Sequence, residues 1–384
     1  MNSSAGPKSM SPSERVPELD GLRGLAILLV VICHYIANSE HAPLGFWIHH
    51  FLSSLSIGWS GVDLFFVLSG FLIGGILLDS RESPRYFQTF YLRRIHRILP
   101  IYYAWIFLYM AVVSTAVLLI PRAVSLTRLD LAQAPKYLLF LQNMMYEPTR
   151  FQWQWFAVTW SLAVEEQFYL LAPPLIRFFS LRRLVVGLCS CVCIAPVLRY
   201  LALRHLEHGS VVAVFAMPCR ADTLAFGILA AVAWRQPKFR MYLREHPAVL
   251  QRAAAWMLVG LAVLTWWLVR PVSVMTITVG YSWLAVFFTC FLLLVLSQTE
   301  GRVARVARWR VLRYLGGISY CVYLIHFTVN QLAHSMILHA APRIYDLPGL
   351  AVTVLAALLT LVVADLSWRY FERPLIRRGH RYSY

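Results

Sequence analysis

The chain has 384 residues, of which 59% are hydrophobic and only 14% are charged. This composition excludes an ordinary soluble globular domain and indicates a protein that crosses the lipid bilayer several times. The net charge of +17 would suit a nucleic acid. However, Lys and Arg form short clusters between apolar runs rather than one stripe, so the membrane accounts for them and we expect no nucleic-acid partner.

The apolar runs predict an all-α polytopic membrane fold of about ten transmembrane helices, because about 20 apolar residues span a bilayer. The expected spans are 22–38, 57–78, 97–119, 159–179, 183–203, 211–233, 249–269, 274–297, 314–336 and 349–369. An even number of spans places both termini on one side of the membrane. Most basic residues fall in the connections on that side, so the positive-inside rule makes the N-terminus and the C-terminus cytoplasmic.

The sequence divides into one large domain and two short tails. Residues 1–16 contain Ser, Pro and Lys without an apolar core, which predicts a disordered cytoplasmic tail rather than a cleavable signal peptide. Residues 17–379 form a single transmembrane domain, and residues 380–384 form a cytoplasmic tail. The seven cysteines lie in apolar runs without Cys-x-x-Cys spacing, so we expect buried thiols and no metal site.

The longest connection on the opposite side, about residues 120–158, is rich in aromatic and amide side chains. Loops of this length are often functional. One interpretation is an aromatic belt at the membrane surface. The other is that Trp153 and Trp155 form the mouth of an acceptor site, on which a sugar-like or other ring-shaped acceptor stacks.

Ionisable side chains inside a predicted span are costly unless they are paired or line a water-filled cavity, so each is a candidate for function. His34 is the best candidate for proton transfer, because a neutral imidazole can accept a proton from an attacking hydroxyl. The alternative is a histidine that only hydrogen-bonds between helices. The other groups expected at similar depths are Glu165, Glu166, Arg220, Asp222 and His326, and Asp63 is expected near the outer end of the second span.

Two further placements follow from helix geometry. Adjacent residues are about 100° apart, so only one of Glu165 and Glu166 faces a given cavity. That glutamate either orients the imidazole of His34, as a carboxylate does in hydrolase triads, or neutralises Arg220. Arg220 and Asp222 do not face one another, so each is expected to pair elsewhere.

Arginines mark the expected cytoplasmic edge. Arg23 and His34 share a face of the first span within about 20°, and lie about 16 Å apart along its axis. Arg93, Arg94 and Arg97 stand together at the entry of the third span, with a spacing that suits phosphate. Ordinary positive-inside anchoring also accounts for this charge. If the cluster binds phosphate, the ligand enters from the cytoplasm.

The motifs together resemble those of the bacterial integral-membrane acyltransferases of the acyltransferase-3 type. Members move an acyl group, usually acetyl, from a cytoplasmic coenzyme A thioester to a hydroxyl of a sugar or natural product. The resemblance spans nearly the whole chain, and no esterase-like domain of the kind that some members append is expected after the last helix. It rests on Leu19-Asp-Gly-Leu-Arg-Gly with His34, Gly61-Val-Asp-Leu-Phe-Phe-Val-Leu-Ser-Gly70, Arg93-Arg-x-x-Arg-x-x-Pro100, Trp160-Ser-Leu-Ala-Val-Glu-Glu-Gln-Phe-Tyr169, Arg220-x-Asp222 and Gly317-Ile-Ser-Tyr-x-x-Tyr-Leu-x-His326.

The resemblance implies that His34 is essential for transfer and that Glu165 and Glu166 lie near the reaction centre. It also implies that acyl-CoA, as a co-substrate, is held by Arg23, Arg93, Arg94 and Arg97. The expected supporting polar core consists of Asp63, Ser69, Arg220, Asp222 and His326. No tightly bound cofactor is expected. The implied acceptor is a carbohydrate, a lipid-linked sugar or a glycosylated small molecule, and the implied location is the bacterial cytoplasmic (inner) membrane.

The expected function is O-acetyl transfer to a hydroxyl at the extracytoplasmic side. His34, oriented by Glu165 or Glu166, would remove the hydroxyl proton, and Arg220 or a nearby donor would stabilise the oxyanion. An acyl-histidine intermediate is the alternative route. Two rival functions are a transporter, because intramembrane ionisable groups also form proton relays, and a non-catalytic component of a polysaccharide export complex.

Overall fold

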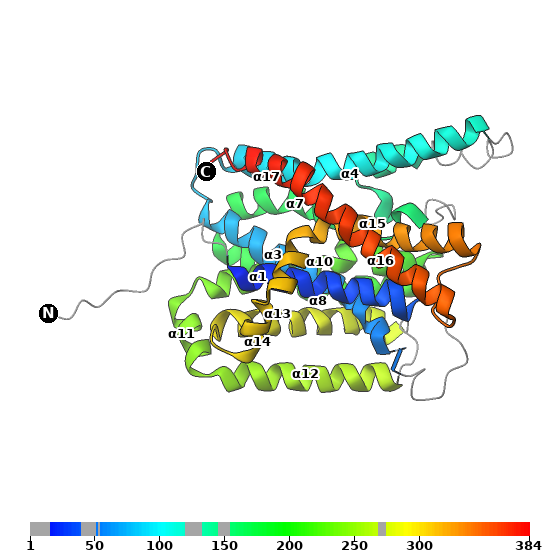
Figure 1. Ribbon diagram of the computed structural model, residues 1–384. Coiled ribbons are helices and arrows are strands. Elements are labelled where there is room, and N and C mark those ends of the chain that lie inside the picture. Colours follow the sequence, from blue (N-terminus) through cyan, green and yellow to red (C-terminus); the bar gives the residue numbers. More distant parts are fainter. Residues whose placement is uncertain (1–15, 40–50, 53, 120–132, 145–153, 268–273) are drawn as a thin grey trace.

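The computed structural model describes residues 16–39, 51–52, 54–119, 133–144, 154–267 and 274–384 (Figure 1). Within these ranges the regular elements are all helical. They are α1 (Pro17–Ile32), η1 (Cys33–Ala37), η2 (Leu55–Ser60), α3 (Gly61–Asp79), α4 (Tyr86–Leu119), η4 (Gln142–Met144), α7 (Trp160–Phe178), α8 (Leu181–His205), α9 (Gly209–Phe215), α10 (Met217–Trp234), α11 (Pro237–Glu245), α12 (Pro247–Trp267), η5 (Thr276–Gly280), α13 (Tyr281–Ser297), α14 (Arg302–Ala307), α15 (Arg310–Leu338), α16 (Leu347–Ser367), η6 (Trp368–Glu372) and α17 (Arg373–Gly379).

Eight helices in the described part of the chain are long and apolar enough to cross a membrane, and they coincide with eight of the predicted spans. They cover Pro17–Ala37, Leu55–Asp79, Tyr86–Thr115, Leu181–His205, Gly209–Trp234, Thr276–Ser297, Arg310–Leu338 and Leu347–Gly379. The other two predicted spans are occupied by α7 and α12, which have 19 and 21 residues. The all-α polytopic fold is therefore confirmed, and the orientation of the termini stays a prediction.

Helix α4 differs from the expected span 97–119 because it begins at Tyr86 and runs for 34 residues. The three arginines at 93, 94 and 97 consequently stand within the helix rather than before it. Pro100 also lies inside α4, where its missing N–H leaves one helical hydrogen bond unmade. The expected tail 380–384 packs back onto this part of α4.

Small residues let the central helices touch along their backbones. A Cβ atom on Gly24 of α1 would come within 1.9 Å of the carbonyl oxygen of Leu312 in α15. Likewise, a Cβ atom on Gly70 of α3 would come within 2.2 Å of the carbonyl oxygen of Leu224 in α10. Close approach at small residues is how membrane helices gain van der Waals contact without a hydrophobic driving force. These contacts fix α1, α3, α10 and α15 relative to one another, and most of the buried ionisable groups lie on these helices.

The helices share two ends, seen at the left and right of Figure 1. The left end carries the start of α1, together with α11, α14, α17 and the C-terminus. We call it the basic end, because Arg81, Arg235 and Arg308 stand there on the connections or helix termini. Helix α1 therefore leads from the basic end toward the opposite end, where η1 carries His34.

Candidate active site

The central feature of the candidate active site is a pair of histidines from distant parts of the chain. His34 Nδ1 lies 2.8 Å from His326 Nε2. The other ring nitrogen of His326, Nδ1, lies 2.8 Å from the carbonyl oxygen of Tyr323 and 3.0 Å from that of Val322. Carbonyl oxygens only accept, so His326 Nδ1 carries a proton and its Nε2 accepts one from His34 Nδ1. The Nε2 atom of a neutral His34 then holds a free lone pair.

The surroundings hold this pair in place. His326 is fully buried, whereas His34 is partly exposed and makes no hydrogen bond through Nε2 to a described residue. Tyr35, next to His34, donates its hydroxyl proton to the carbonyl oxygen of His326 at 2.9 Å. The same hydroxyl lies 2.9 Å from Thr360 Oγ1 on α16. Because both His34 and Tyr35 lie on the π-helical turn η1, this turn hydrogen-bonds to His326 at its ring and at its backbone.

The sequence left Glu165 or Glu166 either to orient His34 or to neutralise Arg220, and the hydrogen bonds of Glu165 go to other residues. Its carboxylate accepts hydrogen bonds from Ser69 at 2.9 Å and from the Tyr169 hydroxyl at 3.1 Å. Glu166 lies within electrostatic range of Glu165, Arg94 and Tyr102. Among the described residues, orientation of His34 therefore comes from His326. The expectation that a glutamate orients the imidazole is corrected on this geometry.

The arginines expected to hold the donor divide into an inner group, formed by Arg23, Arg94 and Arg97, and one outer residue, Arg93. Arg23 and Arg97, on α1 and α4, lie within electrostatic range of one another and of Glu165. Arg23 also contacts Asp20 at 3.4 Å, the limit of a hydrogen bond. Arg94 lies over the rings of Phe90 and Tyr169, with its guanidinium carbon 5.9 and 5.8 Å from their centroids.

Arg93, the outer member, is used differently. Its Nε and Nη2 atoms donate to the carbonyl oxygen of Tyr382, at 2.9 and 2.6 Å. By contrast, no carboxylate within the described ranges forms an ion pair with Arg94 or Arg97. Guanidinium groups that are not held by a contacting carboxylate attract anions, so Arg94 and Arg97 retain the capacity to bind phosphate.

Arg220 and Asp222 pair with different partners, as the helix geometry predicted. Arg220 Nη2 donates to Asp63 Oδ1 at 2.5 Å, and both side chains are almost completely buried. The guanidinium carbon of Arg220 also lies 3.9 Å from the ring centroid of Tyr281, a cation–π contact. Arg220 is thus neutralised by Asp63 rather than by Glu165 or Glu166.

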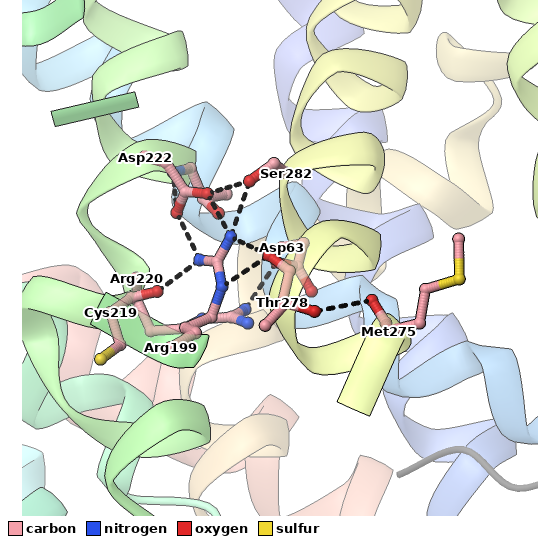
Figure 2. Close-up of polar contacts among 9 residues, drawn as sticks. Asp63, Arg199, Cys219, Arg220, Asp222, Met275, Thr278 and Ser282 are labelled. Atoms are coloured by element: carbon pink, nitrogen blue, oxygen red, sulfur yellow. Dashed lines mark hydrogen bonds and ion pairs between the residues drawn. The ribbon is translucent and has the colours of Figure 1, made fainter. Parts of the chain in front are cut away.

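Asp222 pairs with Arg199, a residue that the sequence interpretation missed (Figure 2). Arg199 Nη1 and Nη2 donate to the two carboxylate oxygens at 3.1 and 2.9 Å, and Ser282 Oγ donates to Asp222 at 2.6 Å. Arg199 also donates to the carbonyl oxygens of Cys219 and Thr278. This network joins α8, α10, η5 and α13. The sequence feature that could have revealed Arg199 was its position inside the predicted span 183–203, where an arginine needs a partner.

The expected acceptor mouth is only partly visible. Trp153 lies outside the described residues. Trp155 is 4% exposed, and its ring packs against Trp105 at a centroid distance of 4.7 Å and against Tyr109 at 5.6 Å. Since these neighbours cover its ring, Trp155 offers no open stacking surface in this structure. Its role toward an acceptor stays a prediction.

The described residues contain no group of three or more His, Cys, Asp or Glu side chains that could hold a metal ion. Arg23 and Arg97 lie within electrostatic range of Glu165, which accepts a hydrogen bond from Ser69, and none of these four residues hydrogen-bonds to the histidine pair. The chemistry available is thus anion binding at the arginines and proton transfer at the histidine pair.

Comparison with known protein families identifies the class of reaction. Residues 16–369 match the model of the acyltransferase domain family called Acyl_transf_3. The chain belongs to this acyltransferase family. No solved structure matches this member of the family.

Curated relatives of this acyltransferase-family protein carry O-acetyltransferase names. OatA of Staphylococcus aureus is 26% identical over 378 residues, which cover 95% of this chain and 58% of that protein. A second protein of the same species, provisionally named an O-acetyltransferase, is 26% identical over 397 residues, covering 99% of this chain and 60% of its own length. The chain thus spans less than two thirds of the length of these relatives.

Proposed function

We propose that this acyltransferase-family protein transfers an acyl group, in particular acetyl, from acyl-CoA to a hydroxyl of a carbohydrate or glycosylated acceptor. The observation that carries the proposal is the pairing of His34 with His326. It leaves a partly exposed imidazole with a free lone pair on Nε2, which is what a general base for a hydroxyl requires.

In the proposed reaction, His34 Nε2 takes the proton as the acceptor oxygen attacks the thioester carbonyl carbon. The carbon–sulfur bond then breaks, and the thiolate of coenzyme A receives that proton from the His34 imidazolium. His326 stabilises the imidazolium through its Nε2 lone pair and fixes the ring orientation, the role that a carboxylate has in a hydrolase triad. Ester and free thiol are the products, so atoms and charge balance.

The positions of the inner arginines support the proposed donor side. Arg23 and His34 are eleven positions apart in one continuous helical stretch, which corresponds to about 16 Å along the axis. The arm of coenzyme A can extend by about the half-thickness of a bilayer core, roughly 15 Å. A donor whose phosphates contact Arg23 and Arg97 at the basic end therefore brings its thioester near His34. We propose that the basic end is cytoplasmic and that transfer takes place toward the extracytoplasmic side of the inner membrane.

The test uses membrane vesicles that contain the wild-type protein or the His34→Ala variant, supplied with isotopically labelled acetyl-CoA. We expect label in the glycan or glycosylated-metabolite fraction, detected by mass spectrometry, and loss of about 10²–10⁴-fold in rate in the variant. A folded His34→Ala variant with full activity would refute the assignment. A transporter would leave the label in the acetyl-CoA pool.

The same preparation distinguishes direct transfer from an acyl-histidine route. If the acyl group first bonds to His34 Nε2, labelled acetyl-CoA without acceptor should leave label on the protein. Direct attack predicts no trapped label and a ternary complex of enzyme, donor and acceptor. The covered Nδ1 of His34 makes Nε2 the only ring atom open to acylation.

A further inference from the structure

The C-terminal segment, residues 380–384, lies on the outer side of the arginine cluster of α4. Arg93 donates from Nε and Nη2 to the carbonyl oxygen of Tyr382, at 2.9 and 2.6 Å. One helical turn earlier, the buried Thr89 donates from Oγ1 to the carbonyl oxygen of Ser383 at 2.9 Å. Figure 1 shows the C-terminus beside the first half of α4. The segment is therefore attached to the helix that carries three of the expected donor-binding residues.

Ring contacts extend this attachment. The guanidinium carbon of Arg93 lies 5.1 Å from the centroid of the Tyr384 ring, and the rings of His96 and Tyr382 are 5.8 Å apart. At the end of α17, Gly379 is so close that a Cβ atom there would be 3.0 Å from the Cβ atom of His96. Tyr384 also lies within electrostatic range of Arg94. The segment thus covers the outer edge of the cluster.

The hydrogen bonds that hold the segment are of a kind that a phosphate can replace. Both Arg93 and Thr89 donate to neutral main-chain carbonyl oxygens, and no carboxylate side chain takes part. Guanidinium groups form shorter and stronger hydrogen bonds with charged phosphate oxygens than with neutral acceptors. The Tyr382 and Ser383 residues are also exposed, so water can replace their contacts as the segment leaves.

We propose that residues 380–384 form a strap that closes on Arg93 when no donor is bound and is displaced by the phosphates of acyl-CoA. The inference rests on the proposed function, because it takes acyl-CoA as the anion that the cluster receives. It assigns Arg93 two alternative partners, the Tyr382 carbonyl in the closed form and a phosphate in the open form. The strap lowers the apparent donor affinity by the fraction of molecules in the open form.

The first test compares coenzyme A binding to the full chain and to a variant that ends at Gly379, by calorimetry in detergent or nanodiscs. A strap closed in about nine molecules of ten predicts a Kd about tenfold lower in the shortened variant. The matched control is Arg381→Gln in the full chain, because the truncation also removes that charge. An equal or higher Kd in the shortened variant would overturn the strap.

The second test follows the segment itself. The Ser383 side chain is exposed and the segment is held through its main-chain oxygen, so Ser383→Cys can carry an environment-sensitive dye without breaking the contact. The exposed Cys189, Cys191 and Cys193 are replaced by Ser in this variant, so that the dye labels the segment. We expect coenzyme A to change the dye emission over the same concentration range as binding, and an unchanged emission during binding would contradict the proposal. If neither chain length binds coenzyme A, the proposed function fails and the strap fails with it. Binding with unchanged Kd refutes the strap alone.

Discussion

The substitution Arg199→Gln tests how far a single buried ion pair sustains the fold. Arg199 and Asp222 are both fully buried, and the guanidinium is shared among the Asp222 carboxylate, Ser282 and two carbonyl oxygens (Figure 2). Glutamine is too short and too poor in donors to replace these contacts. It would leave the Asp222 carboxylate inside the bundle with only Ser282 and the Thr223 N–H as donors.

The expected loss in the free energy of unfolding is large. Breaking a buried pair by removing one partner costs about 3–5 kcal/mol, because an uncompensated charge remains inside. The carbonyl oxygens of Cys219 and Thr278 also lose a donor, and a buried acceptor without a partner costs about 1–3 kcal/mol. Part of this second cost is relieved where the carbonyl keeps its helical hydrogen bond. We therefore expect a loss near the upper end of the first range.

Cysteines within the fold provide the assay. Cys33, Cys219 and Cys321 are buried and free, whereas Cys189, Cys191 and Cys193 are exposed on α8, contrary to the expectation that all the thiols are buried. In a background with these three exposed cysteines replaced by Ser, a thiol-reactive fluorescent dye reports when the purified protein unfolds on heating. The decisive comparison is the double variant Arg199→Met with Asp222→Leu, in which no buried charge remains. Replacement of a buried pair by apolar residues is often nearly neutral.

We expect the double variant to regain most of the stability that Arg199→Gln loses. If instead the double variant is as unstable as the sum of the two single variants, the two residues do not act as a pair, and the reasoning is refuted. Because Arg199 contacts neither the histidine pair nor the arginine cluster, the KM for acetyl-CoA of the folded fraction should not change.

Three further predictions concern the site and its scaffold. His326→Ala should lower kcat by about 10²–10⁴-fold with little change in the KM for acetyl-CoA, because His34 loses the hydrogen-bond partner that keeps its proton on Nδ1. A wild-type kcat in a folded variant would contradict this. Arg97→Gln should raise the KM for acetyl-CoA more than Arg93→Gln does, because Arg93 is already bonded to the C-terminal segment. Steady-state kinetics measure both KM values, and the reverse order would contradict the division into inner and outer arginines. Gly24→Ala should destabilise the fold by about 1–3 kcal/mol or more, since its Cβ atom would meet the Leu312 carbonyl, whereas Gly317→Ala has open space and serves as the matched control in the same melting assay. Equal melting temperatures for the two alanine variants would exclude backbone contact at Gly24.

The sequence showed which ionisable groups need partners, and only the structure showed every partner. The sequence placed His34, Arg220 and Asp222 inside apolar spans, and the cost of such charges in lipid required partners for them. Helix periodicity excluded a bond between Arg220 and Asp222, which is confirmed by their separate pairing with Asp63 and Arg199. It did not select His326 over Glu165 for His34. Residues 34 and 326 are 292 positions apart, and periodicity acts only within one helix.

What the sequence by itself determined is the helical, membrane-spanning character of the chain, because a backbone in lipid must satisfy its hydrogen bonds within each apolar segment. It also determined which helices carry costly polar groups. Only the tertiary structure decided which groups meet, through close backbone approach at glycines such as Gly24 and Gly70. It likewise placed the C-terminal segment on Arg93, since no local pattern links a tail to a helix almost 300 residues earlier. Long-range packing of this kind depends on side-chain shape at every helix contact, and a single sequence does not reveal those contacts.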